Sequence, residues 1–341
     1  MNRLTRVALM LLMGAGTATA QTLEIPALGS LELVFQQAAA VESYPGQPAA
    51  AEVTFRNGEA FNIPSPGRVM QIEYLVEPGT SLEADTPFAV LRGPEMHHLE
   101  MSYESSQALA LAAQRRFKSN KALYESKAIN EQRWLEISEQ YYALMLEYEH
   151  MRHFFELVVS GDDDPDALTL AAPFAGLIVY RATDKGIEEG DTIAQFLPPD
   201  AVRLKVALPN AIGMEVATVN AGRCNLAIER VSAMTDGFFV QAWTQAVTDN
   251  CHLMLGQSVL ATPMIRSSDT YRVTRSAVFQ LGTENYVLTR SGDTLSAIEV
   301  TLLATSGDDY LLQSATQLDA VPVLTSSVSA AQGILLGLGG E

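Results

Sequence analysis

A long helical pattern from about His97 to Val158 constrains the fold of this chain more than any other stretch. In its second half, apolar and aromatic residues recur in alternating steps of three and four, which is the spacing of a heptad seam. These residues are Trp134, Ile137, Tyr141, Leu144, Tyr148, Met151, Phe155 and Val158. The first half keeps the spacing with a weaker set, namely Tyr103, Ser106, Ala110, Ala113, Phe117, Asn120 and Tyr124.

The helical pattern pauses at Ser126–Glu131, where Asn130 suits the N-cap of a second helix. Two antiparallel helices of roughly 28 residues, each about 40 Å long, are expected on either side of the pause. The faces away from the seam are polar along most of their length, with Glu104, Lys118 and Glu139 among the residues. Because a helix in a globular core needs a broader apolar face, the alternative of an ordinary core element is disfavoured.

The N-terminus has the pattern of a signal peptide over residues 1–20. Arg3 and Arg6 precede the apolar run Val7–Met13, and Ala18-Thr19-Ala20 offers a cleavage site before Gln21. The run is too short for a good membrane span, and no later apolar stretch approaches the roughly 18 residues that a span needs. The mature chain is therefore expected in an exported, oxidising space.

Cys224 and Cys251 are an even pair inside one β-patterned region. A structural disulfide is the favoured interpretation in an oxidising space, and two unpaired thiols are the alternative. No cluster of His or acidic residues at ligand spacing accompanies them, which argues against a metal site. The formal net charge of −18 argues against nucleic acid and anionic membrane surfaces as partners.

Short strand patterns separated by Pro and Gly turns lie on both sides of the helical segment. Pro66-Gly67 and Glu77-Pro78-Gly79 precede it, and Ala172-Pro173-Phe174-Ala175-Gly176 and Glu189-Gly190 follow it as an imperfect repeat. The helices thus read as an insertion between two halves of one β unit. Strands before residue 62 are expected to pair with strands much later in the chain. Asn210–Val216 suits a short helix, and Gly333–Glu341 suits a poorly ordered tail.

In this order of parts the sequence resembles the periplasmic adaptors, or membrane fusion proteins (HlyD-like), of Gram-negative tripartite efflux pumps. The resemblance covers almost the whole mature chain. Besides the turns above, it rests on Pro66-Gly67-x-Val69, on Leu255-Gly256-Gln257-x-Val259 and on Ser276-Ala277-Val278, in that order around the helices.

The resemblance implies a mainly β fold with a long α-helical hairpin. A lipoyl-like β-sandwich is split by an antiparallel coiled-coil hairpin, and a β-barrel and a membrane-proximal β domain follow. The expected boundaries are 21–62 for N-terminal strands that contribute to the barrel and the membrane-proximal domain, 63–93 for the first lipoyl-like half, 94–159 for the hairpin, 160–199 for a linker and the second half, 200–266 for the barrel, 267–328 for the membrane-proximal domain and 329–341 for a flexible tail.

The resemblance also implies the partners. They are an inner-membrane efflux transporter, an outer-membrane channel protein and further copies of the chain, in a homo-oligomer that is a hexamer or a trimer of dimers. The chain would lie in the periplasm, associated with the inner membrane. A resistance-nodulation-division (RND) pump is the expected partner, and an ABC exporter or a type I secretion system is the alternative.

In this family the hairpin turn meets the periplasmic end of the channel, and many members carry there an Arg, a Leu four residues on and a Ser seven residues further. Ser119, Leu123 and Asn130 take these places here, so the arginine is missing. The docking residues are expected among Ser119, Leu123, Tyr124, Ser126, Lys127, Ala128, Ile129 and Asn130. The alternative is that Leu123 and Ile129 only close the hairpin and that Asn130 only caps a helix.

Other chemistry has weaker support. Met96, His97, His98 and Met101 combine ligand types that suit Cu(I), so a periplasmic copper- or silver-binding protein of a metal efflux system is an alternative function. Packing at the start of a helix is the favoured interpretation of these residues. Asp162, Asp163, Asp164 and Asp166 lack the glycine and the glutamate of an EF-hand loop and read as a solvated linker.

No enzymatic constellation is found. The sequence contains neither Gly-x-Ser-x-Gly nor His-Glu-x-x-His. In lipoyl or biotin carriers the modified lysine sits on the turn between the two sandwich halves, and here the whole hairpin takes the place of that turn. The sequence therefore predicts a protein that is not an enzyme and has no cofactor.

Overall fold

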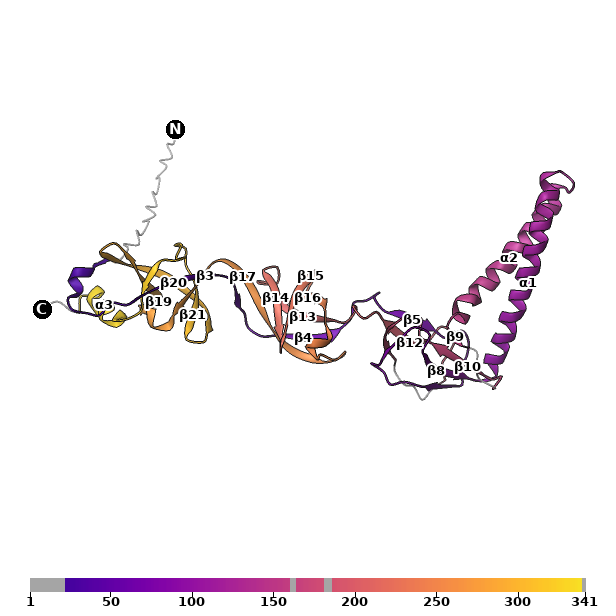
Figure 1. The fold of residues 1–341 in the computed structure, drawn as a ribbon, viewed down its shortest axis with the longest axis horizontal. Helices are drawn as coiled ribbons and strands as arrows, with labels where there is room; N and C mark the ends of the chain where they lie inside the picture. Colours follow the sequence, from indigo (N-terminus) through magenta and orange to yellow (C-terminus); the bar gives the residue numbers. More distant parts are fainter. Residues whose placement is uncertain (1–21, 160–163, 181–185, 339–341) are drawn as a thin grey trace, which may run out of the picture. The chain divides into compact units, whose positions relative to one another are not determined.

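The computed structural model describes residues 22–159, 164–180 and 186–338, and it divides them into two compact units that are described separately here. Unit 2 consists of Ala50–Leu208 and Ala221–Ala261, and unit 1 takes the remaining described residues. The predicted signal peptide, Asp162 and Asp163 lie outside the described residues. The protein is mainly β with two long helices (Figure 1).

Eight short strands of unit 2 form two antiparallel four-stranded sheets. One sheet has the order β6-β8-β10-β9, with bounds Gln71–Tyr74, Pro87–Arg92, Ala167–Ala171 and Val158–Val159. The other has the order β5-β12-β11-β7, with bounds Phe61–Pro64, Thr192–Leu197, Gly176–Val179 and Ser81–Leu82. Each sheet takes two strands from before the helices and two from after them. The strands before the helices and the strands after them can therefore form these two sheets only together.

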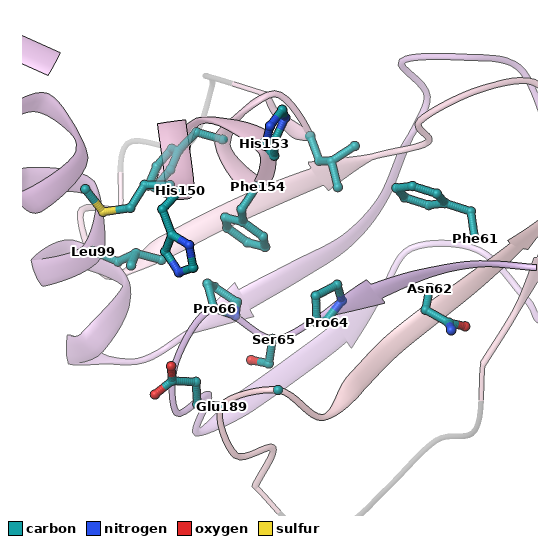
Figure 2. A pocket seen from close by; sticks show the side chains of 14 residues that line it. Phe61, Asn62, Pro64, Ser65, Pro66, Leu99, His150, His153, Phe154 and Glu189 are labelled. Atoms are coloured by element: carbon teal, nitrogen blue, oxygen red, sulfur yellow. The ribbon is translucent and has the colours of Figure 1, made fainter. Parts of the chain in front are cut away.

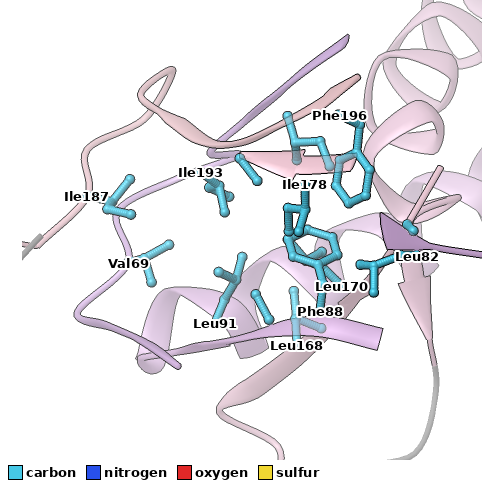
Figure 3. Packing of buried hydrophobic residues seen from close by; sticks show 14 of the residues in the cluster. Val69, Leu82, Phe88, Leu91, Leu168, Leu170, Ile178, Ile187, Ile193 and Phe196 are labelled. Carbon is cyan, nitrogen blue, oxygen red and sulfur yellow. The ribbon is translucent and has the colours of Figure 1, made fainter. Parts of the chain in front are cut away.

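The two sheets share one apolar core (Figure 3). Phe88 of β8 and Phe196 of β12 are both fully buried and meet edge to face, with ring centroids 5.1 Å apart. Most of the other core side chains come from the strands, because every second residue of a half-buried strand points to the same face. The other buried core residues include Ile63, Val69, Leu82, Leu91, Leu168, Leu170, Ile178, Ile187 and Ile193.

Gly176 of the repeated motif is required by a close approach of two backbones. A Cβ atom at this position would lie 2.4 Å from the carbonyl oxygen of Leu197 on the neighbouring strand. The motif Ala172-Pro173-x-x-Gly176 thus places a residue without a side chain where β11 enters its pairing with β12.

The two long helices of unit 2 are α1 (Pro94–Glu125) and α2 (Glu131–Phe155). α1 begins three residues before the start of the helical pattern at His97, and α2 ends three residues before the end of that pattern at Val158. Where the helices leave the sandwich, the Gly93 N–H donates to Asp166 O at 2.9 Å, and Arg92 pairs with Asp164 at 2.8 Å. In the described part of the chain, no helix is long and apolar enough to cross a membrane.

The rest of unit 2 is a set of antiparallel strands in the order β15-β16-β13-β4, with bounds Cys224–Asp236, Phe239–Ala246, Arg203–Pro209 and Ala49–Thr54. Cys224 and Cys251 form a disulfide with their Cα atoms 5.4 Å apart. It joins the first residue of β15 to the short 3-10 helix Asp249–Cys251.

Unit 1 is an antiparallel β unit to which both ends of the described chain contribute. The late strands are β17 (Ser258–Thr274, unit 1 from Thr262 on), β18 (Val278–Leu281), β19 (Glu284–Ser291), β20 (Thr294–Ser306), β21 (Asp309–Gln313) and β22 (Pro322–Leu324). The early strands β1 (Thr22–Glu24), β2 (Phe35–Gln37) and β3 (Ala39–Pro45) pair with β20, β22 and β17. This is the long-range pairing expected of the N-terminal strands. Strand β14 (Val216–Ala221) also pairs with β17.

Two local predictions were wrong. Residues 329–341 were expected as a flexible tail, but α3 (Val328–Leu335) packs Val328 and Ala331 into a core with Leu288 and Leu324. The spacing of its apolar residues gives the short helix one buried face, which offsets the low helix propensity of its glycine. Residues 210–215 are a series of turns, not a helix, because hydrogen bonds to Pro209 O and Ile212 O close them tightly, and Val216 begins β14.

Candidate functional site at the hairpin turn

α1 and α2 run antiparallel and meet along the predicted seam. Ser106, Ala110, Ala113 and Ile137 are buried, and the aromatic seam residues are half-buried. Ring contacts follow the antiparallel order, from Tyr103 on Phe155 at 4.1 Å near the sandwich to Tyr124 on Trp134 at 5.1 Å near the turn. Small residues on α1 let the larger side chains of α2 approach, so the weak half of the seam has a packing role.

The turn is closed by backbone hydrogen bonds at the C-terminus of α1. The N–H of Lys127 donates to Tyr124 O at 2.9 Å, and the N–H of Ala128 donates to Leu123 O at 2.7 Å. This pair of bonds is a Schellman motif, which places Lys127 in the left-handed region with φ of 60°. The Ser126 hydroxyl adds a bond to Leu123 O at 3.1 Å. The carbonyl oxygens of Leu123 and Tyr124 in the last turn of α1 are thereby satisfied.

Asn130 begins the second helix as its N-cap. Its side-chain oxygen accepts a hydrogen bond from the N–H of Arg133 at 2.9 Å, and its backbone is extended, as expected for this position. Asn130 is exposed, so the same amide group still faces solvent with its second donor and acceptor capacity. Capping and an outward polar contact are therefore compatible at this residue.

The eight predicted docking residues divide by what their side chains do. Tyr124 is half-buried under Trp134, and Ser126, Lys127, Ala128 and Asn130 build the turn and the cap. Ile129 is half-buried. Leu123 lies in the last turn of α1 and is 44% exposed, which makes it the large outward apolar side chain among the eight.

Ser119, the position at which the resemblance places an arginine, is exposed, and its hydroxyl donates to Arg116 O within its own helix at 3.0 Å. The nearby Arg116 donates to Gln140 Oε1 on α2 at 2.9 Å. Arg116 therefore does not replace the missing arginine at the surface of the turn, because its side chain is held across the two helices.

Sequence reasoning did not single out Leu135, a further exposed apolar residue near the turn. It is 51% exposed and follows Asn130 by little more than one helical turn. Its neighbour Trp134 lies on the seam, so the next residue points away from α1, since consecutive helical residues are about 100° apart. An apolar residue one position off the seam was the signal that would have identified it.

The Met–His group at the start of α1 does not gather on one surface. Met96 is fully buried in the sandwich core, whereas His98 and Met101 are exposed. Among residues 22–159, 164–180 and 186–338, no group of three or more His, Cys, Asp or Glu side chains is placed to hold a metal ion. Met96 therefore packs into the sandwich core at the start of α1.

Comparison with known proteins gave structural matches only. No protein-family model matches the sequence, and no curated protein matches it. A putative efflux transporter from Bacteroides eggerthii is 17% identical with a TM-score of 0.44, over 82% of this chain and 89% of that chain.

Two further solved structures carry descriptive names. The membrane fusion protein Spr0693 from Streptococcus pneumoniae is 12% identical with a TM-score of 0.37, over 62% of this chain and 98% of that chain. The periplasmic adaptor protein EmrA is 12% identical with a TM-score of 0.37, over 67% of this chain and 100% of that chain. Likeness at this level does not itself assign a function. Two of these three structures are described by name as a membrane fusion protein and a periplasmic adaptor protein.

Proposed function

We propose that the protein is the periplasmic adaptor subunit of a tripartite efflux system. In this proposal the two four-stranded sheets are a lipoyl-like sandwich, α1 and α2 are an inserted coiled-coil hairpin, and the remaining strands supply a β-barrel and a membrane-proximal domain. The adaptor forms a ring that links an inner-membrane transporter to an outer-membrane channel for the export of small molecules.

The hairpin is the observation that carries the proposal. Its helices have 32 and 25 residues and bury their apolar seam against each other, not in a globular core. At about 1.5 Å per residue, such an element extends tens of ångströms beyond the sandwich, which is more than the stability of a small domain requires. A long helical pair with an exposed turn is suited to reaching a partner at a distance.

The outer faces of the hairpin support self-assembly. Large apolar side chains are exposed at Leu109, Leu111, Leu135, Tyr142 and Leu146. On α2 the last three are seven and four residues apart, so they form a second stripe beside the seam. Packing of hairpins from neighbouring copies would cover these side chains, in a homo-oligomer that is a hexamer or a trimer of dimers.

The turn is proposed as the contact with the channel, with Leu123 as its apolar anchor and Asn130 as a hydrogen-bonding group. Unit 1 and the strands that follow the sandwich would meet the transporter, for which an RND pump is the first choice and an ABC exporter the second. The net charge of −18 is unsuited to nucleic acid.

Removal of the hairpin tests the proposal. Tyr103 of α1 and Tyr148 of α2 stack across the hairpin with ring centroids 5.7 Å apart, so a short Gly/Ser linker can replace residues 104–147 with little strain. Met96 and β9 then stay in the sandwich. The shortened protein is expected to keep its folded sandwich and disulfide and to lose cross-linking to outer-membrane channels in cell envelopes. The full-length chain with Leu111→Ala serves as the control for expression and export. Undiminished cross-linking of the shortened protein would refute the proposed role of the hairpin.

A further inference from the structure

A pocket of about 390 Å³ lies in unit 2 where the hairpin joins the sandwich (Figure 2). One wall comes from β5 and from Ser65 and Pro66 after it, and the other from Leu99 of α1 and the last turns of α2. Figure 2 shows His150 and Glu189 towards one end and Phe61 towards the other, with Phe154 between them above Pro66. The volume falls in the range of pockets that hold small organic molecules.

The pocket walls are aromatic and aliphatic. Phe154 and Leu157 pack part of their surface on the sandwich core, and the remaining surface lines the pocket. Phe61 is 46% exposed and is supported from one side by Phe174, with ring centroids 6.1 Å apart. A phenylalanine supported on one side presents a free ring face, which favours stacking with a flat apolar group.

The carboxylates at the pocket are not balanced by lysine or arginine among the described lining residues. A second hollow of about 420 Å³ shares Phe61, His153 and Leu157 with the first and reaches Asp85 and Glu156. No lysine or arginine lines either hollow in the part of the chain that the structure describes. Glu156 already pairs with Arg152.

Glu189 and Asp85 form no ion pair with any described residue, although the neighbouring Glu188 pairs with Arg68 at 3.6 Å. Two carboxylates without an ion pair among the described residues thus flank an apolar groove. A ligand with a positive charge would restore the balance, whereas an anion would be repelled from both ends.

We propose that this pocket binds lipophilic organic cations, with an aryl group against Phe61 and Phe154 and the positive charge towards Glu189. A neutral molecule would gain only the apolar contact. The proposal goes beyond the adaptor role and does not depend on it, because the site lies within one chain and requires neither the channel nor the pump.

Calorimetry on the purified full-length protein, with tetraphenylphosphonium and tetraphenylborate as probes, tests the charge preference. The two ions have nearly the same shape and opposite charge, so their difference in affinity reports the sign of the site. Because the whole chain is acidic, the titrations are done at about 0.15 M salt, where long-range attraction is screened. The expected result is saturable one-to-one binding of the cation, at least about ten-fold tighter than binding of the anion.

Substitutions then locate the site. Glu189→Gln is expected to weaken cation binding about five-fold, whereas Glu188→Gln, which removes the same charge from the adjacent residue outside the pocket, leaves it unchanged. Phe61→Ala is expected to weaken it about ten-fold through lost apolar contact, and its exposure keeps the risk to folding low. Equal affinity for the two probes, no saturable binding, or binding that neither Glu189→Gln nor Phe61→Ala alters would overturn the proposal.

Discussion

Tyr124 and Trp134 stack face to face across the hairpin turn, with ring centroids 5.1 Å apart and planes 7° from parallel. Tyr124 is the last seam residue of α1, and Trp134 is the first of α2. Phe117 contacts the same indole ring at 4.9 Å. Three aromatic residues therefore hold the two helix ends together at the place where the Schellman motif and the Asn130 cap define the turn.

Trp134→Ala is expected to loosen the turn without unfolding the sandwich. The substitution removes the stacking on Tyr124 and the contact with Phe117, at a local cost of about 2 kcal/mol. Hydrogen exchange should become faster for amides within residues 117–140 and stay unchanged in β8, β10 and β12. Leu135→Ala, an exposed position next in sequence, is the matched control. Exchange that is unchanged in the turn would contradict a stabilising role for this aromatic group.

The seam and the cap were predictable because each depends on local spacing. Alternating steps of three and four place Ala113 and Ile137 on the buried face, and Asn130 stands directly before a helical pattern. The turn itself offered less signal, since Lys127 takes the left-handed position that glycine usually occupies. Leu123 and Leu135 are exposed because they lie beside the seam. This exposure can be recognised only when the two helices are packed against each other.

The pocket was not predictable because its walls come together only through the sheet topology. Phe61, Phe154 and Glu189 are separated by 93 and 35 positions in the sequence, and no short motif contains two of them. The α3 helix escaped prediction for a related reason. Its eight residues have marginal intrinsic helicity, and the partners that stabilise it, Leu28 and Leu288 among them, lie far away in the sequence.

The disulfide is expected to stabilise unit 2 by closing a loop between residues 27 positions apart. The double substitution Cys224→Ser with Cys251→Ser should lower the free energy of unfolding by about 3 kcal/mol, as expected for a loop of this length. Urea unfolding followed by Trp fluorescence measures the change. The reduced wild-type protein is the control and should match the double variant. Equal stability of oxidised and reduced wild type would show that the cross-link contributes nothing.

Glu229 should make stability depend on acidic pH. The hydrogen bond from Arg56, whose Nη2 lies 2.6 Å from Glu229 Oε2, lowers the pKa of the Glu229 carboxyl below its ordinary value of 4.5, with further lowering by the charge of Arg203. A carboxyl with a lowered pKa in the folded state contributes stability above pH 4.5 and loses it as the pH falls through the lowered pKa.

Glu229→Gln is therefore expected to cost about 0.5–1 kcal/mol at pH 7, a small value because solvent screens this partly exposed pair. The difference from wild type should shrink as the pH falls below 4.5 and through the lowered pKa, because the carboxyl is then protonated in folded and unfolded chains alike. Urea unfolding across this pH range is the measurement, and Glu284→Gln, at an exposed glutamate in unit 1, is the control. A difference that persists unchanged through this range would mean that charge is not its cause.

A substitution at Leu123 can separate an effect on channel docking from an effect on the stability of the fold. Its side chain is 44% exposed, so Leu123→Glu should change the free energy of unfolding by no more than about 0.5 kcal/mol. If the turn inserts this leucine into the channel, a buried carboxylate there should reduce site-specific cross-linking to the channel about ten-fold or more. Met101→Glu, at a 52% exposed position about six turns away on the same helix, is the matched variant and should retain channel cross-linking. Equal losses for the two variants would place the channel contact along the side of the hairpin, and a loss for Met101→Glu alone would remove the turn from the interface.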